Sequence, residues 1–347
     1  MTDFVSSPRK AAIIAAALLL FATPALAAET LTVTVYGGTF EQGWRKAVIE
    51  PFEKANPEIK VQIATGLTFE NVALMRAQKG DVKVDVLMMD EVASSAAASE
   101  GLFQPLTPET VPNMKELFPR FRVAGDPYTK FMYVVQVLAY NTDRIKTAPT
   151  SYKDLWSPAL KGHVGIGDIT NTTGIIFFLI ANQMNGGTIQ NADPAFKAIA
   201  ALKPSIVTYT SQHAQISQLM TSEDIWIHPW VSDRAQGLMD SGAPVKWLIP
   251  AEGGILIDST IGIAKGTKHM EAAQKYVDFV LSRQAQLDNA RYTNLNPVNQ
   301  TVQLPPDLAA RLPAGQNALE RVSVPDWNDV NKVRAGWTDR WSREITN

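Results

Sequence analysis

The chain has 347 residues, no cysteine and nearly balanced charges, with 34 Asp and Glu against 32 Lys and Arg and a net charge of −2. This balance excludes the strongly basic surface of a protein that binds nucleic acid or an anionic membrane. Without cysteine, the fold cannot depend on disulfides and the chain cannot be a lipoprotein tethered through an N-terminal Cys. The length allows one large or two ordinary domains, and the hydrophobic fraction of 46% can supply substantial cores.

The N-terminus has the order of a secretory signal peptide. Arg9 and Lys10 precede an apolar run over 11–21, and a small-residue cleavage site follows at Ala25-Leu26-Ala27. The alternative is a membrane anchor, which requires about 20 apolar residues, more than this run contains. We therefore expect residues 1–27 to be removed on export to the periplasm.

The mature chain begins with a strand, a turn, a helix and a second strand within residues 31–63. Leu31, Val33 and Val35 alternate with threonines at the period of a strand, and apolar residues over 44–52 repeat at helical spacing. Gly37-Gly38 lies between them, where an open α/β sheet presents backbone N–H groups to a ligand. The alternative is a tight turn with no binding role.

Alternation of strands and helices continues along the chain. A helix is expected over 69–78, a buried strand over 84–90 that ends at Asp90, and an alanine-rich helix over 93–100. After a proline-rich connection, the apolar stretch 131–141 is too long for one ordinary strand. We interpret it as a chain that passes between two lobes.

A second series of strands and helices follows this stretch. The expected strands cover 164–168, 206–209, 225–227 and 245–249, and the expected helices cover 175–184, 195–202, 214–220 and 234–239. Another long apolar strand over 255–264 is a candidate return crossing, and an amphipathic helix is expected over 270–281. In the tail, Trp327, Trp337 and Trp341 are expected to be packing anchors.

The run Thr170-Asn171-Thr172-Thr173 precedes the apolar helix 175–184. Hydroxyl and amide groups at a helix N-terminus suit a carboxylate, a phosphate or a sugar hydroxyl. The alternative is plain N-capping of the helix.

Dispersed segments together resemble a known family. They include Tyr36-Gly37-Gly38-Thr39-Phe40, residues 154–162 (DLWSPALKG), Pro250-Ala251-Glu252-Gly253-Gly254 and Asn296-Pro297-Val298-Asn299. In order and spacing the chain resembles the extracellular solute-binding proteins of bacterial ABC importers, in the branch of the spermidine/putrescine-binding and ferric-iron-binding proteins.

The resemblance implies an α/β fold of the two-lobe periplasmic binding protein type (type II), with two hinge crossings and a solute held between closing lobes. The expected division is lobe 1 over 28–137 plus 255–300, lobe 2 over 138–254, and a helical tail over 301–347 that packs on the lobes. It implies a monomeric transport component that delivers a small solute to a cognate permease in the inner membrane, without enzymatic activity, cofactor or nucleic-acid partner.

The resemblance implies that polyamine-binding members of this family hold the ligand in a cage of aromatic rings and carboxylates. This chain keeps only part of such a cage. Trp230 is placed at the mouth of the cleft as a stacking wall, with burial in the core as the alternative, and Asp168 matches an acid of the family. Where a second acid would follow, the chain has Asn171. A solute with both amine and acid groups, amino-acid-like or opine-like, fits better than a pure polyamine. The candidate ligand contacts are Tyr36, Gly38, Thr39, Phe40, Asp90, Asp168, Asn171, Thr172, Thr173, Trp230, Asp233, Asp258 and Ser259.

Three other interpretations are weaker. The tyrosine pair of the iron-binding members is missing and the four histidines lack metal-ligand spacing, so no metal site is expected. The alternative function is a secreted α/β hydrolase, but no Gly-x-Ser-x-Gly elbow, His-Glu-x-x-His motif or cysteine nucleophile occurs. A structural or adhesion protein is disfavoured because the chain has no repeats.

Overall fold

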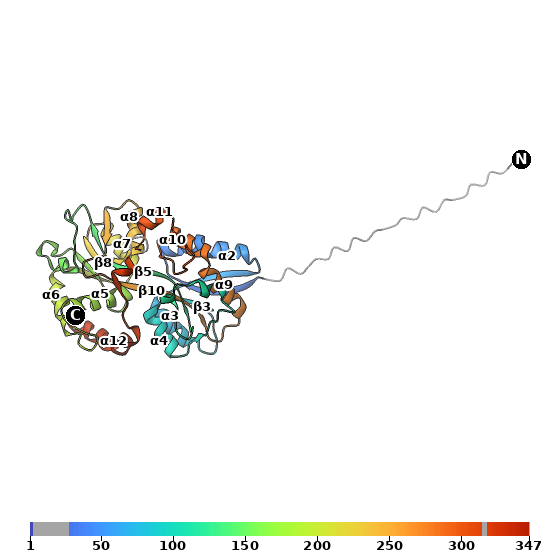
Figure 1. Ribbon diagram of the computed structural model, residues 1–347, viewed down its shortest axis with the longest axis horizontal. Coiled ribbons are helices and arrows are strands. Elements are labelled where there is room, and N and C mark those ends of the chain that lie inside the picture. The colour runs from blue at the N-terminus through green and yellow to red at the C-terminus, as the bar shows by residue number, and fades with distance from the viewer. Residues whose placement is uncertain (3–27, 314–317, 347) are drawn as a thin grey trace.

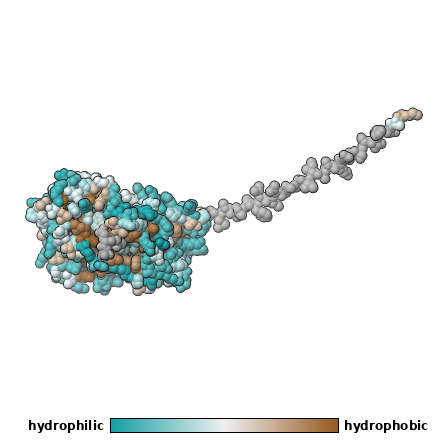
Figure 2. All heavy atoms as spheres, turned by 45° about the horizontal axis from the view of Figure 1, so that its top comes forward, coloured by the Kyte–Doolittle hydropathy of each residue, from teal (hydrophilic) through white to brown (hydrophobic). Residues whose placement is uncertain are grey.

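The computed structural model describes residues 1–2, 28–313 and 318–346, so the expected signal peptide lies almost entirely outside the described residues. Two α/β lobes lie side by side (Figure 1). Hydrophilic residues cover most of the face seen in Figure 2, and hydrophobic residues gather near its middle. Within the described ranges, no helix is long and apolar enough to cross a membrane.

Lobe 1 is built around parallel strands from the first part of the chain. Its elements are β1 (Glu29–Val35), α1 (Thr39–Trp44), α2 (Glu50–Ala55), β2 (Ile59–Thr65), α3 (Thr68–Ala77), β3 (Val86–Asp90), α4 (Glu91–Ser99) and β4 (Phe103–Gln104). A π-helical segment, Arg45–Ile49, joins α1 to α2, so the helix expected from the apolar spacing is continuous. β1 pairs in parallel with both β2 and β3, which places their carboxyl ends at one edge.

Strand β5 (Thr129–Asn141) belongs to both lobes. Its first half pairs with β10 (Gly254–Ala264), and its second half, from Gln136 onward, pairs with β8. The prediction that this stretch passes between lobes is confirmed. The prediction that it is too long for one strand is wrong, because all 13 residues are buried and both halves find a pairing partner.

Lobe 2 is a second parallel unit. It contains β6 (Val164–Gly167), α5 (Thr172–Met184), α6 (Asp193–Leu202), β7 (Ile206–Thr210), α7 (His213–Thr221), β8 (Ile227–Val231), α8 (Ser232–Asp240) and β9 (Val245–Leu248). β6 pairs in parallel with β7 and with β8, so these three strands also end at one edge. The main path of the sheet in the described residues has the order β2-β1-β3-β10-β5-β8-β6-β7, with β9 beside β5 and β4 and β11 beside β10.

The strand expected over 225–227 is displaced. It occupies Ile227–Val231 and includes Pro229, which lies opposite Leu138 in the antiparallel pair with β5. Proline has no N–H to donate to a neighbouring strand, so it usually ends a strand or lies at an edge. In the structure the strand continues through it, with its neighbours His228 and Trp230 fully buried.

The remaining helices cover the lobes and join them. They are α9 (Met270–Leu281), α10 (Arg283–Thr293), α11 (Pro306–Arg311) and α12 (Trp327–Trp341), with the short strand β11 (Val322–Ser323) beside β10. α12 contacts both lobes: Asn331 donates to the Val92 carbonyl of α4 over 2.8 Å, and Trp337 packs 5.0 Å from Phe178 of α5. The expectation that Trp327, Trp337 and Trp341 are packing anchors is confirmed by their burial.

The core of lobe 1 is anchored by Trp44, whose side chain has no exposed surface. The ring contacts Phe131 edge-on at 5.3 Å, and its indole N–H donates to the hydroxyl of Tyr276 over 2.9 Å. A buried indole N–H needs such a partner, because an unpaired one would cost about 1–3 kcal/mol. The contact therefore joins α1 to α9 in the core of lobe 1.

Candidate functional site

The carboxyl ends of the strands of both lobes face one another. In open α/β sheets this edge is the usual ligand site, because loops and helix N-termini converge there. β1 and β3 bring Tyr36 and Asp90 to the edge in lobe 1, while β6 and β8 bring Thr172 and Asp233 to the edge in lobe 2. The two edges are in direct contact in this structure.

Asp90 is the centre of that contact. Its Oδ1 accepts a hydrogen bond from the Tyr36 hydroxyl over 2.9 Å and a longer one from Ser259 over 3.4 Å. Its Oδ2 accepts from the Thr172 hydroxyl over 2.6 Å, which links lobe 1 to the N-terminus of α5 in lobe 2. Thr68 adds a 3.3 Å contact to the Asp90 backbone N–H. The sequence prediction named all these residues except Thr68.

The electrostatic state of Asp90 is unusual for a carboxylate with so many donors. Burial raises its pKa, and the hydroxyl groups of Thr172, Tyr36 and Thr68 only partly oppose this effect. Among the described residues no Lys, Arg or His side chain lies within 4.0 Å of it as an ion-pair partner. The burial of Tyr36 itself and then the charge of Asp90 raise the pKa of Tyr36, which therefore remains a neutral donor.

Asp233 and Arg234 form a second charged pair at the start of α8. Arg234 Nε lies 3.3 Å from Asp233 Oδ2, and Nη1 donates to the Thr39 hydroxyl of lobe 1 over 3.4 Å. The guanidinium carbon of Arg234 lies 5.2 Å from the ring centre of Phe40, at cation–π distance. Arg234 therefore contacts the turn after β1 from the opposite lobe.

Three buried oxygen atoms in this region have no hydrogen-bond partner among the described residues. They are Asp233 Oδ1, Gln136 Oε1 and Asp258 Oδ1. Gln136 lies where β5 passes between the lobes, and its amide N–H donates to the Thr173 carbonyl over 3.3 Å. Burial raises the pKa of Asp233, and the charge of Asp90 raises it further, so the two acids interact. An unpaired buried acceptor costs about 1–3 kcal/mol, which a bound donor would recover.

Asp258 and Ser259, adjacent in β10, point in different directions. Ser259 contacts Asp90, whereas Asp258 Oδ2 forms a 2.6 Å ion pair with Lys130. Lys130 is also 2.9 Å from Glu91, so the side chains make a buried triad. Burial raises the pKa of Asp258 to about 7, and Lys130 opposes that shift. The Lys130 ammonium group thus neutralises Asp258, whereas Ser259 is one of the residues that contact Asp90.

The hydroxyl-rich run before α5 divides into capping residues and one residue that contacts Asp90. Asn171 Oδ1 accepts from the Gly174 N–H over 2.9 Å, and its amide donates to the Thr210 carbonyl over 2.9 Å. Asp168 Oδ1 accepts from Thr170, and its Oδ2 accepts from the Trp341 indole over 3.2 Å. Asn171 therefore caps the helix, as the alternative interpretation held, and Asp168 connects α5 to α12.

Trp230 lies within β8, not beyond its end. Its side chain has no exposed surface, and its indole N–H donates to His213 Nδ1 over 2.9 Å. The expectation of a ring at the mouth of the cleft is not met in this structure, because the strand continues past Pro229 and places the ring in the interior. The core alternative describes its observed position.

The Gly37-Gly38 turn leaves β1 next to these residues. Gly38 has a φ of 74°, in the left-handed region that favours glycine. A Cβ on Gly37 would lie 2.9 Å from Thr65 Cγ2, so the Thr65 side chain would have to move to admit it. The turn itself therefore favours glycine at Gly38, and it brings Thr39 and Phe40 to Arg234.

Sequence reasoning missed three polar residues of this region: Thr68, Gln136 and Arg234. Arg234 had the clearest signal, because it directly follows Asp233 at the start of an expected helix. Gln136 is an amide in the middle of the long apolar stretch of β5 and could have been singled out as a buried polar group that needs a partner. Thr68 gave no signal beyond that of a helix start.

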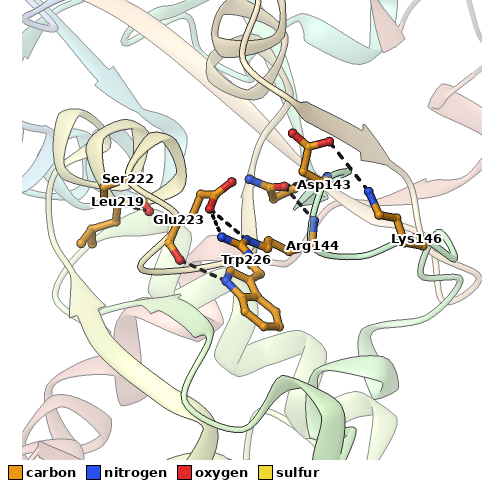
Figure 3. A network of polar contacts seen from close by, with 8 residues as sticks. Asp143, Arg144, Lys146, Leu219, Ser222, Glu223 and Trp226 are labelled. Carbon is orange, nitrogen blue, oxygen red and sulfur yellow. Dashed lines mark hydrogen bonds and ion pairs between the residues drawn. The ribbon is translucent and has the colours of Figure 1, made fainter.

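Other clusters and cavities lie elsewhere. Figure 3 shows Arg144 paired with Glu223, whose carbonyl accepts from the Trp226 indole over 3.0 Å. This cluster precedes β8 and is therefore at the opposite end of that strand. Cavities of about 210 and 330 Å³ open beside α5 and β10 and beside α3 and α4, respectively. In the described part of the chain no group of three or more His, Cys, Asp or Glu could hold a metal ion.

Comparisons with known proteins identify the family to which this chain is similar. The sequence pattern of the family described as bacterial extracellular solute-binding protein matches residues 47–314. The gamma-aminobutyric acid-binding protein of Pseudomonas aeruginosa is 24% identical over 89% of each chain. The spermidine/putrescine-binding periplasmic protein of Salmonella typhimurium is 24% identical over 92% of this chain and 90% of its own length.

A match to an uncharacterized protein of Haemophilus influenzae is 25% identical and spans 65% of each chain. Among solved structures, a GABA receptor has a TM-score of 0.76 and 26% identity, over 90% of this chain and 97% of the receptor. Proteins of this family are non-enzymatic components that bind small solutes and deliver them to a permease, so the hydrolase alternative is not supported. The chain belongs to the bacterial extracellular solute-binding protein family and is the substrate-binding component of an ABC transporter.

Proposed function

We propose that the protein captures a solute that carries an amino group at one end and an acid group at the other, with the form of an ω-amino acid. The observation that carries this proposal is Asp90, a carboxylate with a raised pKa and no ion-pair partner among the described residues. An ammonium group would supply the missing charge and further hydrogen-bond donors.

The second acid supports the same location for the ammonium group. Asp233 interacts electrostatically with Asp90 and has a buried oxygen with no partner among the described residues. A buried carboxylate whose pKa is raised by a second carboxylate favours a cation between the two, because the cation stabilises the ionised form of both acids.

Arg234 would bind the acid end of the solute. Its guanidinium has five N–H donors and only a long 3.4 Å contact to Thr39 and a 3.3 Å contact to Asp233. A carboxylate or phosphonate can accept two of these N–H groups side by side. A polyamine would instead place a second cation next to Arg234, which disfavours a diamine.

The native setting follows from the family. We propose a monomer in the periplasm, released by cleavage after Ala27, with lobe 1 over 28–137 plus 255–300 and lobe 2 over 138–254. The tail over 301–347 packs on both lobes. Asp90, Tyr36, Thr172, Ser259, Asp233 and Arg234 form the ligand set, and the cognate permease receives the closed complex.

Native mass spectrometry of the purified protein, followed by a thermal-shift screen, tests this proposal. The screen compares 4-aminobutyrate, 2-aminoethylphosphonate, an opine, putrescine and spermidine. A ligand at 100 times its Kd stabilises the fold by about 2.7 kcal/mol, so the correct class gives a clear rise in Tm. Stabilisation by putrescine or spermidine and by none of the amino acids would contradict the proposal.

A further inference from the structure

The hydrogen bond between Trp230 and His213 determines which ring nitrogen of His213 carries the proton. An indole N–H can only donate, so His213 Nδ1 must accept and carries no proton. In a neutral imidazole the single proton is then on Nε2, which becomes an N–H donor and cannot accept. Burial, together with the charges of Arg234 and His228, lowers the pKa of His213 to about 3, so the ring stays neutral near pH 7.

The position of His213 gives this donor a use. His213 is the first residue of α7 and follows β7, which ends at the same edge as β6 and β8. Arg234, which reaches Thr39 of lobe 1, is close enough to influence the His213 ring electrostatically.

The Nε2 atom is free to bind a ligand. Within the described ranges it has no hydrogen-bond partner, and it is not among the fully buried polar atoms that lack one. His213 as a whole residue is half-buried. The donor therefore keeps access to the space beside the edge of lobe 2.

We propose that His213 is a specificity-determining residue that donates its Nε2–H to an oxygen of the acid group of the solute, and that Trp230 is the positioning residue that holds His213 in this tautomer. This inference rests on the proposed function. It also gives the buried Trp230 a role in recognition without direct contact with the solute.

The arrangement selects between solute classes. A carboxylate or phosphonate oxygen accepts from Nε2–H and lies beside the Arg234 guanidinium. An ammonium group has only donors, so at this position it would face an N–H group with no acceptor. His213 therefore favours an ω-amino acid over a diamine of similar length.

Calorimetric titration of the purified protein with 4-aminobutyrate and with putrescine tests the role of His213. His213→Phe keeps an aromatic ring and removes both nitrogens, and we expect it to weaken 4-aminobutyrate binding about 10- to 100-fold. Putrescine binding should not weaken. His213→Gln, which keeps one acceptor and one donor, should recover part of the loss. His163→Phe is the matched control, because His163 is a half-buried histidine that stacks on Trp226 at the other end of β8.

Nitrogen-15 NMR of the histidine rings tests the role of Trp230. In the wild type, His213 should be neutral with a proton on Nε2 alone, and Trp230→Phe should populate the other tautomer while the protein remains folded. A wild-type His213 that carries its proton on Nδ1 would overturn the positioning role.

The outcomes separate the two proposals. If the wild type binds 4-aminobutyrate and His213→Phe binds it equally well, the inference about His213 is wrong and the proposed function stands. If the wild type binds 4-aminobutyrate no better than putrescine, the proposed function is wrong, and the selection attributed to His213 is wrong with it.

Discussion

The hydroxyl of Thr172 in lobe 2 donates to the Asp90 carboxylate of lobe 1 over 2.6 Å. This bond joins the N-terminus of α5 to the end of β3, so it can form only when the lobes are together. Asp90 thereby takes part both in closure and in the proposed binding of the ammonium group. We expect closure and binding to be coupled through this carboxylate.

Thr172→Val tests the contribution of this bond to closure. Valine has nearly the same shape but no donor, and a hydrogen bond to a charged acceptor contributes about 1.5–3 kcal/mol. Small-angle scattering should show a smaller radius of gyration with saturating ligand in the wild type, and a free form of Thr172→Val that is more open than the wild type. Thr170→Val, an exposed neighbour, is the matched control. An unchanged radius in every state would contradict a closing cleft.

Asp90→Asn should weaken the binding of any amine-bearing solute. The change removes the negative charge and keeps the size of the side chain, and we expect a loss of about 1.5–3 kcal/mol, or roughly 10- to 150-fold in affinity. Titration with 4-aminobutyrate measures this loss. Asp81→Asn, at an exposed acid paired with Lys83, should leave affinity unchanged. Equal affinity of Asp90→Asn and wild type would remove Asp90 from the ligand set.

The same carboxylate predicts a pH dependence of binding. An ammonium group binds the ionised form of Asp90, and burial raises the pKa of this acid. The affinity for the solute should therefore decrease as pH falls from neutrality through the raised pKa of Asp90. At pH values above this pKa, the bound ammonium group should keep the carboxylate ionised. In the free protein the sign is opposite: a raised acid pKa contributes stability below the unfolded pKa that is lost as pH rises through the folded one. Measurements between pH 4 and 8 should show both trends, in solute affinity and in the stability of the free protein, in the wild type. In Asp90→Asn, this side chain should contribute to neither trend.

Trp230→Ala should be costly to the fold. The side chain is completely buried, and deletion of a core aromatic typically costs about 3–5 kcal/mol. Urea unfolding without ligand measures this loss. Trp230→Phe keeps most of the volume and should lose much less, so it separates packing from the hydrogen bond to His213. A small loss for Trp230→Ala would instead favour the ring at the mouth of the cleft that the sequence suggested.

The buried triad of Lys130, Asp258 and Glu91 should make stability depend on pH. Burial raises the pKa of Asp258 to about 7, so its contribution is fully present below its unfolded pKa and is lost as pH rises through about 7. Wild type should therefore lose more stability between pH 5 and pH 8 than Asp258→Asn does. Lys130→Met, which leaves two acids without their cation, should cost about 3–5 kcal/mol near neutral pH. Urea unfolding at the two pH values measures this loss of stability. An equal loss in the wild type and in Asp258→Asn would contradict the assignment.

The sequence by itself determined the local elements and the class of the fold. Period-two alternation in β1 and helical spacing in α9 are properties of short segments, and the expected helix over 270–281 has the observed bounds of α9. The ends of the strands could also be located, which led to Tyr36, Asp90 and Thr172 without knowledge of their contacts. Residues after the carboxyl end of a parallel strand converge for a topological reason that does not depend on side-chain detail.

Only the tertiary structure decided which side chains turn toward the other lobe. Asp258 and Ser259 are adjacent polar residues in the sequence. Because side chains alternate along β10, Ser259 contacts Asp90 and Asp258 pairs with Lys130. Trp230 is an aromatic residue after a proline in sequence, and the pairing of Pro229 with Leu138 places it in the interior. Such outcomes depend on strand register between residues far apart in the sequence, and register is set by the packing of whole faces, which no local pattern contains.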